Sequence, residues 1–415
     1  MSEHRRERVV CAICGKDEHQ CHLIQGVAGY VCTECIEGVH SFLLAQQESV
    51  ATPVMHGIEA KELLPPREMK AFLDRYVIGQ DRAKRFLSVA VFNHYKRILS
   101  HRPAGEQPGV ELEKSNVLLV GPTGTGKTLL ARTIARMLKV PFSIVDATVL
   151  TEAGYVGEDV ESILTRLLAA ADYDVAAAER GILFIDELDK IARKSDNPSI
   201  TRDVSGEGVQ QALLKILEGT VVHVPPQGGR KHPEQKMIAV DTKDILFICG
   251  GAFEGIERHI AQRLNTQVVG YGAHRQRERV KASDLIAYIS PQDLRSYGLI
   301  PELVGRLPVI SHLDPLDKKA LRDILTKPEN AIVRQYEELF RYDGITLQID
   351  SEVLDFIVDK AVEYRLGARG LRSICEAILI DGMYELPGSG TDTLHVDLPY
   401  ARRALEREQS LSLQA

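Results

Sequence analysis

The sequence predicts an α/β fold in which helices flank a parallel sheet, with a small cysteine-rich module before it and a small, mainly helical domain after it. Three observations predict this arrangement. Apolar strands alternate with helical patterns between residues 67 and 314. One of these strands runs directly into a glycine-rich loop and a helix, and two cysteine pairs stand near the start of the chain.

The composition is that of a soluble globular protein with two or three domains. Of the 415 residues, 44% are hydrophobic and 26% are charged. The net charge of −7 argues against a chain built to bind nucleic-acid phosphates or anionic membranes. The sequence lacks a long apolar run and begins without the apolar core of a signal peptide. We therefore expect a cytoplasmic location, in which cysteines remain thiols or bind metals.

Two C-x-x-C pairs define the first predicted site. They are Cys11, Cys14, Cys32 and Cys35, with seventeen residues between the pairs. Four thiolates at this spacing can close a tetrahedral Zn²⁺ site, and a metal would stabilise a segment too short to bury a large core. We interpret the zinc as structural; a redox-active pair is the alternative. Cys21 is interpreted as a spare thiol, although it could replace one ligand.

The chain is expected to divide at its composition changes. Residues 1–50 form the zinc-binding module, and residues 51–66 form a proline-containing linker. Residues 67–314 form the large α/β domain. Its clearest predicted strands are residues 116–120, 142–146, 181–186 and 244–249. Their nearly continuous apolar content is typical of parallel strands buried on both faces.

The small C-terminal domain is expected to cover residues 315–406. Its predicted helices are residues 317–342, broken or kinked near Pro328, 351–364 and 371–384. A short strand is predicted at 345–349, where apolar and polar residues alternate. The polar tail at 407–415 is expected to fray.

The most informative stretch follows the strand at 116–120. It reads G-x-x-x-x-G-K-T and consists of Gly121, Pro122, Thr123, Gly124, Thr125, Gly126, Lys127 and Thr128, with Leu129 next. Its glycines let backbone N–H groups surround a phosphate at the start of a helix, as in a P-loop. We predict that Lys127 neutralises the β- and γ-phosphates of ATP during catalysis and that Thr128 holds Mg²⁺. A chance glycine-rich turn would not explain the flanking strand and helix.

A second strand, at 181–186, ends in the carboxylates Asp186 and Glu187. This is the Walker B pattern. Asp186 is predicted to reach Mg²⁺ through water, and Glu187 to orient and deprotonate the water that attacks the γ-phosphate. An acidic strand end is common in other proteins, but here a P-loop lies upstream, and parallel strands end at one edge of the sheet.

Two arginines, Arg306 and Arg369, are also candidates for phosphate contacts. A guanidinium group is always charged and forks onto phosphate oxygens. Taken alone, either residue would be interpreted as a surface ion-pair partner.

These motifs together resemble the ClpX family of AAA+ unfoldases, over almost the full length of the chain. The zinc cluster, the P-loop and the Walker B strand occur in the order of that family. Further matching segments are Tyr76-Val77-Ile78-Gly79-Gln80, Gly154-Tyr155-Val156-Gly157, Arg230-Lys231-His232, Gly367-Ala368-Arg369 and the run at 194–215. The resemblance implies the AAA+ P-loop NTPase fold, with its large and small domains.

For the nucleotide, the resemblance implies that Val77 and Ile78 form the adenine pocket, although plain core packing is the alternative. Arg306 resembles the finger that reaches the γ-phosphate bound by a neighbouring subunit. Arg369 resembles the sensor that couples the nucleotide to the angle of the small domain. An arginine that acts on a neighbour requires a ring, and the ring of this family is a hexamer.

For the substrate, the resemblance implies that Tyr155 and Val156 belong to the pore loop that grips polypeptide. An aromatic and an aliphatic side chain between glycines would make a bulky loop that tolerates many sequences. Arg230, Lys231 and His232 resemble the loop at the pore entrance, which attracts the terminal carboxylate of a substrate. The alternatives are an ordinary loop aromatic and a solvated basic turn.

One segment departs from the family pattern. Where the peptidase-docking loop carries an aliphatic residue, glycine and phenylalanine, this chain has Val269, Gly270 and Tyr271. A phenol hydroxyl buried without a partner would cost roughly 1–3 kcal/mol per contact. Either the pocket of the partner peptidase matches the tyrosine, or this member remodels proteins without degrading them.

The expected function is an ATP-dependent unfoldase that translocates unfolded or tagged protein substrates through a hexameric ring. The zinc module would recruit adaptors, and a Clp-type peptidase would receive the substrate. A stand-alone remodeller is one alternative, and a DNA-remodelling AAA+ ATPase is another, which the acidic balance disfavours. A nucleotide-gated scaffold would not need Glu187, Arg306 and Arg369 together.

Overall fold

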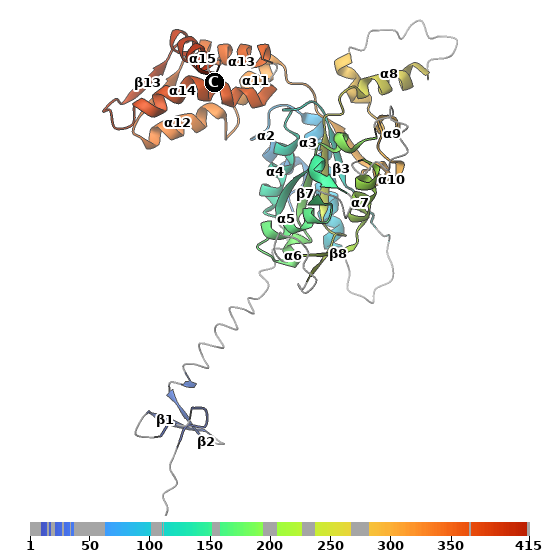
Figure 1. Ribbon diagram of the computed structural model, residues 1–415, viewed down its shortest axis with the longest axis vertical. Helices are drawn as coiled ribbons and strands as arrows, with labels where there is room; N and C mark the ends of the chain where they lie inside the picture. Colours follow the sequence, from blue (N-terminus) through green and yellow to red (C-terminus); the bar gives the residue numbers. More distant parts are fainter. Residues whose placement is uncertain are drawn as a thin grey trace, which may run out of the picture. The chain divides into compact units, whose positions relative to one another are not determined.

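The structure is a computed structural model of the chain. It describes residues 10–14, 16–17, 21–26, 29–33, 35–36, 63–100, 110, 112–151, 158–193, 206–225, 237–266, 282–364 and 367–412. The chain divides into two compact units, residues 1–57 and residues 58–415 (Figure 1). The helices of the described ranges include none that is long and apolar enough to cross a membrane.

The first unit is built on a β-hairpin. Strands β1 (Leu23–Gly26) and β2 (Gly29–Cys32) pair antiparallel, with Leu23 opposite Cys32. Cys11 forms a parallel bridge to Tyr30 of β2. The hairpin therefore brings the turn that carries the first cysteine pair beside β2, which ends at Cys32.

The second unit contains a five-stranded parallel sheet with the strand order β11-β3-β10-β7-β4. The strands are β3 (Val117–Val120), β4 (Phe142–Asp146), β7 (Ile182–Asp186), β10 (Leu246–Gly251) and β11 (Val309–His312). Every residue of β3 and β10 is buried. The sheet confirms the predicted α/β fold, and its strands include the four expected from the sequence. Strand β11 was not predicted, because it is short and follows a proline.

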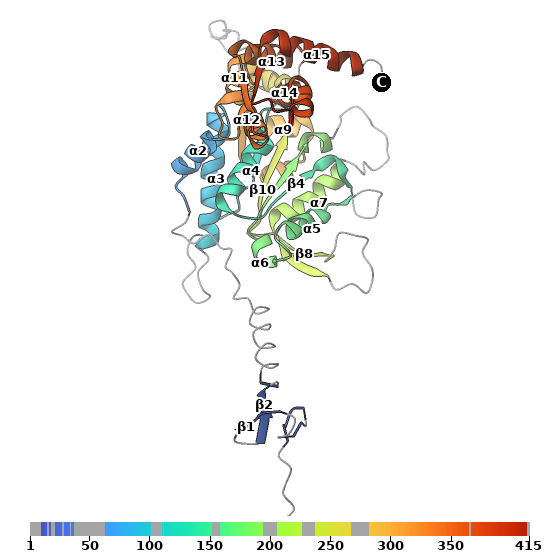
Figure 2. The ribbon, with the colours of Figure 1, turned by 90° about the vertical axis from the view of Figure 1, so that its left-hand side faces the viewer.

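Each face of the sheet carries its own core. Along β3, Val117 and Leu119 face one core, and Leu118 and Val120 face the other, as the two-residue period of a strand requires. The first core is covered by α2 (Pro66–Asp74), α3 (Asp81–Leu99) and α4 (Lys127–Leu138). The second is covered chiefly by α5 (Ser162–Ala170) and α7 (Glu207–Glu218). Figure 2 shows α3 and α4 on one side of the strands and α5 and α7 on the other.

Shorter elements complete this part of the chain. They are β5 (Leu150–Thr151), β6 (Glu158–Asp159), α6 (Val175–Ala178), β8 (Val221–Val224), β9 (Ile238–Asp241), α8 (Ile256–Thr266), α9 (Pro291–Tyr297), α10 (Pro301–Gly305) and the 3₁₀ helices η1 (Ala147–Val149), η2 (Leu188–Ile191) and η3 (Ala282–Tyr288). Strands β8 and β9 form an antiparallel pair, and β5 pairs in parallel with β6.

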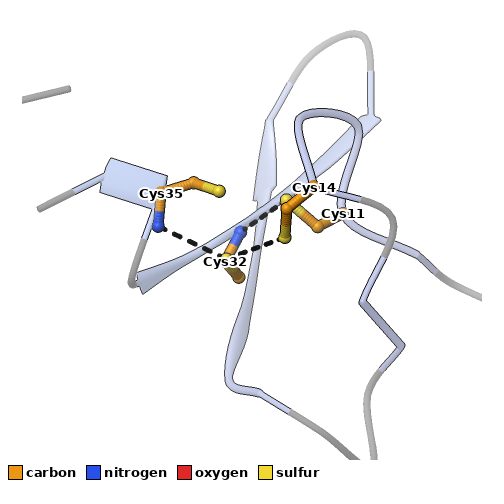
Figure 3. A group of neighbouring side chains, drawn as sticks. All are labelled: Cys11, Cys14, Cys32 and Cys35. Atoms are coloured by element: carbon orange, nitrogen blue, oxygen red, sulfur yellow. Dashed lines mark hydrogen bonds between the residues drawn. The ribbon is translucent and has the colours of Figure 1, made fainter. Parts of the chain in front are cut away.

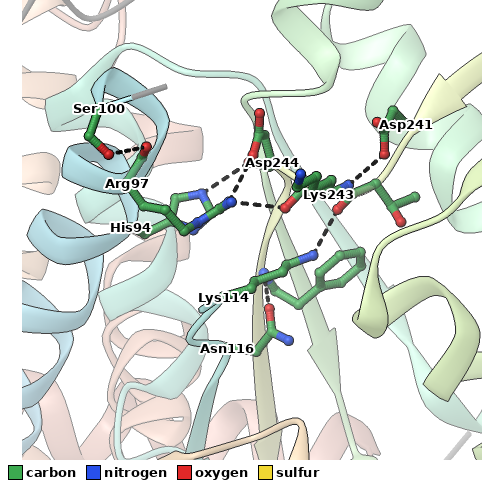
Figure 4. A network of polar contacts seen from close by, with 10 residues as sticks. His94, Arg97, Ser100, Lys114, Asn116, Asp241, Lys243 and Asp244 are labelled. Atoms are coloured by element: carbon green, nitrogen blue, oxygen red, sulfur yellow. Dashed lines mark hydrogen bonds and ion pairs between the residues drawn. The ribbon is translucent and has the colours of Figure 1, made fainter. Parts of the chain in front are cut away.

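A polar network ties α3 to the edge of the sheet where the strands begin (Figure 4). Arg97 on α3 donates to a carboxylate oxygen of Asp244 at 2.8 Å, and His94 Nε2 lies 3.0 Å from the Asp244 carbonyl oxygen. Lys114 Nζ donates to the Thr242 carbonyl oxygen at 2.7 Å. Burial lowers the pKa of His94 to about 3 and that of Lys114 to about 7. The network thus holds α3 against the turn before β10.

A third core, here called the C-terminal core, is formed by buried residues between 321 and 401. Its elements are α11 (Lys318–Thr326), α12 (Ile332–Tyr342), β12 (Thr346–Ile349), α13 (Ser351–Glu363), α14 (Gly367–Glu385), β13 (Thr393–Val396) and α15 (Leu398–Ser412). Strands β12 and β13 pair in parallel. The segment at 317–342, predicted as a helix broken or kinked near Pro328, is two helices separated around Pro328, since proline restricts the residue before it and interrupts the hydrogen-bond ladder. Helix α15 extends past residue 406, where we expected the small domain to end.

A buried glutamine links helix α7 to two distant loops. Gln210 Nε2 donates to the carbonyl oxygens of Ile191, at 2.8 Å, and Gly298, at 3.2 Å. Gln210 Oε1 accepts the N–H of Ile300 at 2.8 Å. The side chain is fully buried. It thus pairs three backbone groups, of which those of Ile191 and Ile300 belong to buried residues.

Replacing Gln210 by alanine is expected to lower the free energy of unfolding by about 2–4 kcal/mol, because buried backbone groups lose their partners. Urea denaturation followed by circular dichroism would measure the change. Gln335→Ala is the matched control, since Gln335 makes an exposed bond to the Asn330 carbonyl oxygen. Equal stability of both variants would contradict the expectation.

Candidate nucleotide and metal sites

The P-loop lies between β3 and α4, at the edge of the sheet where the strands end. Gly124 and Gly126 have φ angles of +82° and +101°, a left-handed conformation that glycine adopts without strain. Gly126 is the N-cap of α4, and no side chain caps the first turn. The N–H groups at the start of the helix are therefore suited to bind an anion.

Lys127 is buried and held by the loop that precedes it. Its Nζ donates to the carbonyl oxygens of Gly121, at 2.7 Å, and Pro122, at 3.1 Å. Burial lowers the pKa of Lys127. A buried ammonium group favours an anionic partner, so phosphate oxygens suit this position better than neutral carbonyl groups do.

The second half of the site comes from the end of β7. Thr128 Oγ1 donates to Asp186 Oδ2 at 3.0 Å, which joins the P-loop helix to the Walker B strand. A hydroxyl and a carboxylate oxygen are ligands that Mg²⁺ prefers, directly or through water. The two residues thus fit the predicted magnesium site.

Glu187 adopts a left-handed backbone conformation, with a φ of +58°. This conformation is uncommon for a residue with a side chain and is found more often at functional sites. The backbone N–H of Glu187 donates to Asp186 Oδ1 at 3.0 Å, which holds the turn in place. The carboxylate of Glu187 is exposed and lines the cavity described next.

One cavity of about 340 Å³ joins these groups. It is lined by Thr123, Gly124, Gly126, Lys127, Thr128, Leu129, Asp186, Glu187, Asp189, Lys190, Ala252, Glu254, Ile324, Ala368 and Arg369. The lining includes α14 of the C-terminal core, and a side chain at Gly124 would lie 3.6 Å from the backbone nitrogen of Ala368. The structure therefore brings Arg369 to the P-loop, although more than 240 residues separate them in the sequence.

The other predicted nucleotide residues lie beside this cavity. Gly121 and Pro122 hold Lys127 through their carbonyl oxygens. Val77 is buried against the P-loop, and a side chain at Gly126 would lie 3.9 Å from Val77 Cγ1. Ile78 is half-buried in the same segment. Thr125 is buried and bonds back to the Pro122 carbonyl oxygen at 2.8 Å.

Sequence reasoning missed part of the lining. Asp189 is buried, and its Oδ1 accepts the Ala252 N–H at 3.0 Å, so the end of β7 is tied to the end of β10. Asp189 lies close to the backbone of β10, since a Cβ atom added at Gly251 would lie 2.8 Å from Asp189 Oδ1. Lys190, Glu254 and Ile324 also line the cavity. Asp189 follows Glu187 closely and could have been suspected, whereas Glu254 and Ile324 carry no local signal.

Arg306 does not reach the cavity of its own chain. It follows α10, and its guanidinium group contacts Glu218 Oε1 at 2.9–3.0 Å. Both side chains are about half exposed. This position agrees with a surface ion pair and equally with a residue that acts on a neighbouring subunit.

The residues predicted to contact substrates and peptidase lie outside the described residues. They are Tyr155, Val156, Arg230, Lys231, His232, Val269, Gly270 and Tyr271.

The four predicted zinc ligands of the first unit form a cluster (Figure 3). The sulfur atoms of Cys11, Cys14, Cys32 and Cys35 all lie within 4.8 Å of one another. Cys14 and Cys32 have sulfur atoms 3.6 Å apart, close to the separation of about 3.8 Å that tetrahedral ligands at ordinary Zn–S distances require. Cys21 stands outside this group, and its sulfur lies 3.5 Å from the Asp17 carbonyl oxygen.

The thiols of the cluster influence one another. The backbone N–H of Cys14 is the main cause that lowers the pKa of Cys11, to about 6. Hydrogen bonding to the neighbouring thiol of Cys32 is the main cause that raises the pKa of Cys35, to about 12. Four thiolates therefore do not form together without a compensating cation. This donor set fits Zn²⁺, which thiolates bind tightly.

Comparisons with known proteins agree with this geometry. Residues 112–310 match the family model described as AAA domain (Cdc48 subfamily), and residues 316–396 match the C-terminal, D2-small domain of ClpB protein. Three relatives carry the name ATP-dependent Clp protease ATP-binding subunit ClpX. The protein of Porphyromonas gingivalis is 60% identical over 408 residues, or 98% of each chain. That of Bacteroides fragilis is 59% identical over 418 residues and the full length of both, and that of Bacteroides thetaiotaomicron is 60% identical over 97% of each.

Proposed function

The chain belongs to the ClpX family, and on that premise we propose that it unfolds and translocates protein substrates as a hexameric ring, as the specificity component of a Clp-type protease. Membership of this family makes the chain an ATPase. The observation that carries the proposal is the single cavity that joins the P-loop, the Walker B carboxylates and Arg369 of the C-terminal core.

Within this cavity, ATP would be bound chiefly by the P-loop. The N–H groups at the start of α4 would face the phosphates, and Lys127 would exchange its carbonyl partners for phosphate oxygens. Thr128 and Asp186 would hold Mg²⁺, which neutralises charge on the phosphates when bound. Val77 and Ile78 would contact the adenine.

Hydrolysis would depend on Glu187. Its exposed carboxylate lines the cavity beside Asp186 and is available to orient a water molecule and to take its proton. The left-handed backbone of Glu187 supports this role, since such uncommon conformations are concentrated at functional sites.

Arg369 would link the bound nucleotide to movement of the small domain. It stands on α14 of the C-terminal core but lines the nucleotide cavity, so its best position depends on the charge of the bound nucleotide. When the γ-phosphate leaves, the attraction that draws α14 toward the P-loop weakens. We propose that this change moves the small domain, residues 315–406, relative to the large domain, residues 67–314.

The parts that handle protein substrates are proposed from family membership. Tyr155 and Val156 would form the pore loop that pulls polypeptide, and Arg230, Lys231 and His232 would attract substrate at the entrance. The zinc-binding module, residues 1–50, would recruit adaptors or substrates, and the linker at 51–66 would join it to the large domain. A cytoplasmic location belongs to the same proposal.

Arg306→Ala is expected to reduce steady-state ATP hydrolysis by roughly 10²- to 10³-fold, because a charged donor to the reacting phosphate is lost. Glu218→Ala is the matched control: it removes the partner of Arg306 in its own chain and should leave hydrolysis largely intact. If Arg306 were only a surface ion-pair residue, the two variants would behave alike.

A mixing experiment tests whether Arg306 acts between subunits. Arg306→Ala and Glu187→Gln subunits are each expected to be nearly inactive alone. In mixed rings, an Arg306→Ala subunit keeps its own Glu187 and receives Arg306 from a Glu187→Gln neighbour. Hydrolysis should therefore reappear on mixing, and its absence in rings shown to be mixed would argue against action between subunits.

A single assay tests the function as a whole. The chain would be mixed with ATP, a tagged fluorescent protein and a Clp-type peptidase. Loss of fluorescence is expected from unfolding, and fragments on a gel from degradation. Unfolding without fragments would favour the stand-alone remodeller that Tyr271 suggests. ATP hydrolysis stimulated by DNA but not by unfolded protein would contradict the proposal.

A further inference from the structure

A glutamine at the start of α3 is bound to the backbone of a residue 234 positions away. Gln80 Nε2 donates to the Asp314 carbonyl oxygen at 2.8 Å, and the Asp314 N–H donates to Gln80 Oε1 at 2.8 Å. The amide thus satisfies both backbone groups of Asp314, as a neighbouring strand would. Gln80 is buried, so water does not compete strongly for these bonds.

Asp314 stands where the chain leaves the sheet for the C-terminal core. Leu313, just before it, donates its N–H to the Val120 carbonyl oxygen at 2.8 Å and so continues the pairing of β11 with β3. Pro315 follows, and Leu321 already belongs to the C-terminal core. The Gln80 amide therefore hydrogen-bonds to Asp314, the last residue before the chain passes from the sheet to the C-terminal core.

The segment that carries Gln80 also contacts the nucleotide cavity. Val77 is buried beside the P-loop, where a Cβ atom added at Gly126 would lie 3.9 Å from Val77 Cγ1. Its carbonyl oxygen accepts from the buried Lys84 at 2.6 Å, and Lys84 also contacts Asp74 Oδ1 at 2.6 Å. The Lys84 bonds therefore hold the segment against α3. We expect the segment to move when the P-loop shifts, because these bonds leave it little freedom to deform.

The other end of the same segment contacts the exposed turn between α11 and α12. Arg75 Nε contacts Glu329 Oε1 at 2.5 Å, and the Glu329 N–H donates to the Arg75 carbonyl oxygen at 2.9 Å. Residues 75–80 thus touch the P-loop, the connection at Asp314 and the turn between α11 and α12. We call residues 75–80 the junction segment.

The backbone conformation at Gln80 indicates that its side chain is needed for the bonds to Asp314. Gly79 and Gln80 have φ angles of +64° and +59°, so two successive residues are left-handed. Glycine adopts this conformation with less strain than glutamine. A glutamine here is therefore unfavourable for the backbone, and the two bonds to Asp314 offset the strain.

We propose that Gln80 is a positioning residue that makes Asp314 move together with the junction segment, so that a change at the P-loop reaches the connection between the cores. The inference deepens the proposed function, on which its consequence for protein unfolding rests. Its structural part, the coupling between a bound nucleotide and Asp314, is independent of what the chain acts on.

Hydrogen exchange on the full chain, with and without Mg·ADP, tests the structural part. In the wild type, nucleotide should slow amide exchange in the segment 313–316, at Leu313, Asp314 and Leu316, since Pro315 has no amide hydrogen. In Gln80→Met, which keeps the length of the side chain but loses both bonds, the Asp314 amide should exchange about fivefold faster or more. The response of residues 313–316 to ADP should disappear, while the affinity for ADP stays near the wild-type value.

Gln80→Gly separates positioning from a purely structural role. Glycine relieves the left-handed strain, so this variant should fold at least as well as Gln80→Met. If Gln80 served only to set the backbone conformation at its own position, ADP would slow amide exchange in Gln80→Gly as it does in the wild type. If it positions Asp314, Gln80→Gly should be as unresponsive as Gln80→Met. Gln335→Ala, which removes an exposed bond within the C-terminal core, is the control and should respond normally.

The consequence for function is measured as protein molecules unfolded per ATP hydrolysed. This ratio should be about tenfold lower in Gln80→Met and in Gln80→Gly than in the wild type, with little change in KM for ATP. An unchanged ratio, or a normal exchange response in either variant, would overturn the proposal. If the wild type unfolds no protein, the proposed function fails, and the exchange response of the variants still decides the role of Gln80.

Discussion

Replacing Glu187 by glutamine is expected to leave ATP bound and to slow its hydrolysis by roughly 10²- to 10⁴-fold. Glutamine has the same shape but cannot take a proton from water. The backbone N–H of residue 187 still donates to Asp186, so the turn and the proposed magnesium site should survive the change. Single-turnover hydrolysis and equilibrium binding of ATP, measured on the same preparation, would separate the two effects.

A second carboxylate in the cavity provides the control for this experiment. Glu254 is exposed and lines the same cavity, but it follows β10 and has no place in the Walker B pattern. Glu254→Gln changes the charge of the cavity by the same amount and should retain most of the turnover. If Glu254→Gln were as inactive as Glu187→Gln, the charge of the cavity would matter rather than one base. Full turnover by Glu187→Gln would exclude Glu187 as the base.

Replacing Cys32 by serine is expected to abolish zinc binding and to unfold the first unit. Cys32 is fully buried, and its sulfur accepts the N–H of Cys35 at 3.4 Å in the middle of the cluster. Structural zinc sites contribute roughly 10–16 kcal/mol of apparent binding free energy at neutral pH, far more than a hairpin of two short strands supplies by itself. Metal analysis and hydrogen exchange over residues 10–36 of the full chain would measure both losses.

Two comparisons sharpen this test. Cys21→Ser should keep one zinc ion per chain, since Cys21 lies outside the cluster. Cys32→Ser should retain basal ATP hydrolysis, because every residue of the nucleotide cavity belongs to the second unit. An undiminished zinc content in Cys32→Ser would rule out the four-cysteine site.

Several features of the site could be predicted because their signals are local. The P-loop, the Walker B strand and each C-x-x-C pair are short stretches in which residue type and spacing define the chemistry. The predicted strands at 116–120 and 181–186 agree with β3 and β7, since long apolar runs report burial on both faces. Strand β13 was missed, because only four residues separate a turn from a helix there.

The sequence alone determined the α/β fold, the glycine-rich loop between β3 and α4 and the four clustered cysteines, since neighbouring residues carry each pattern. Only the tertiary structure placed Arg369 in the cavity, kept Arg306 out of it and joined Gln80 to Asp314. The physical reason is distance along the chain: such pairs meet through the packing of sheet and helices, which no local spacing of residues encodes.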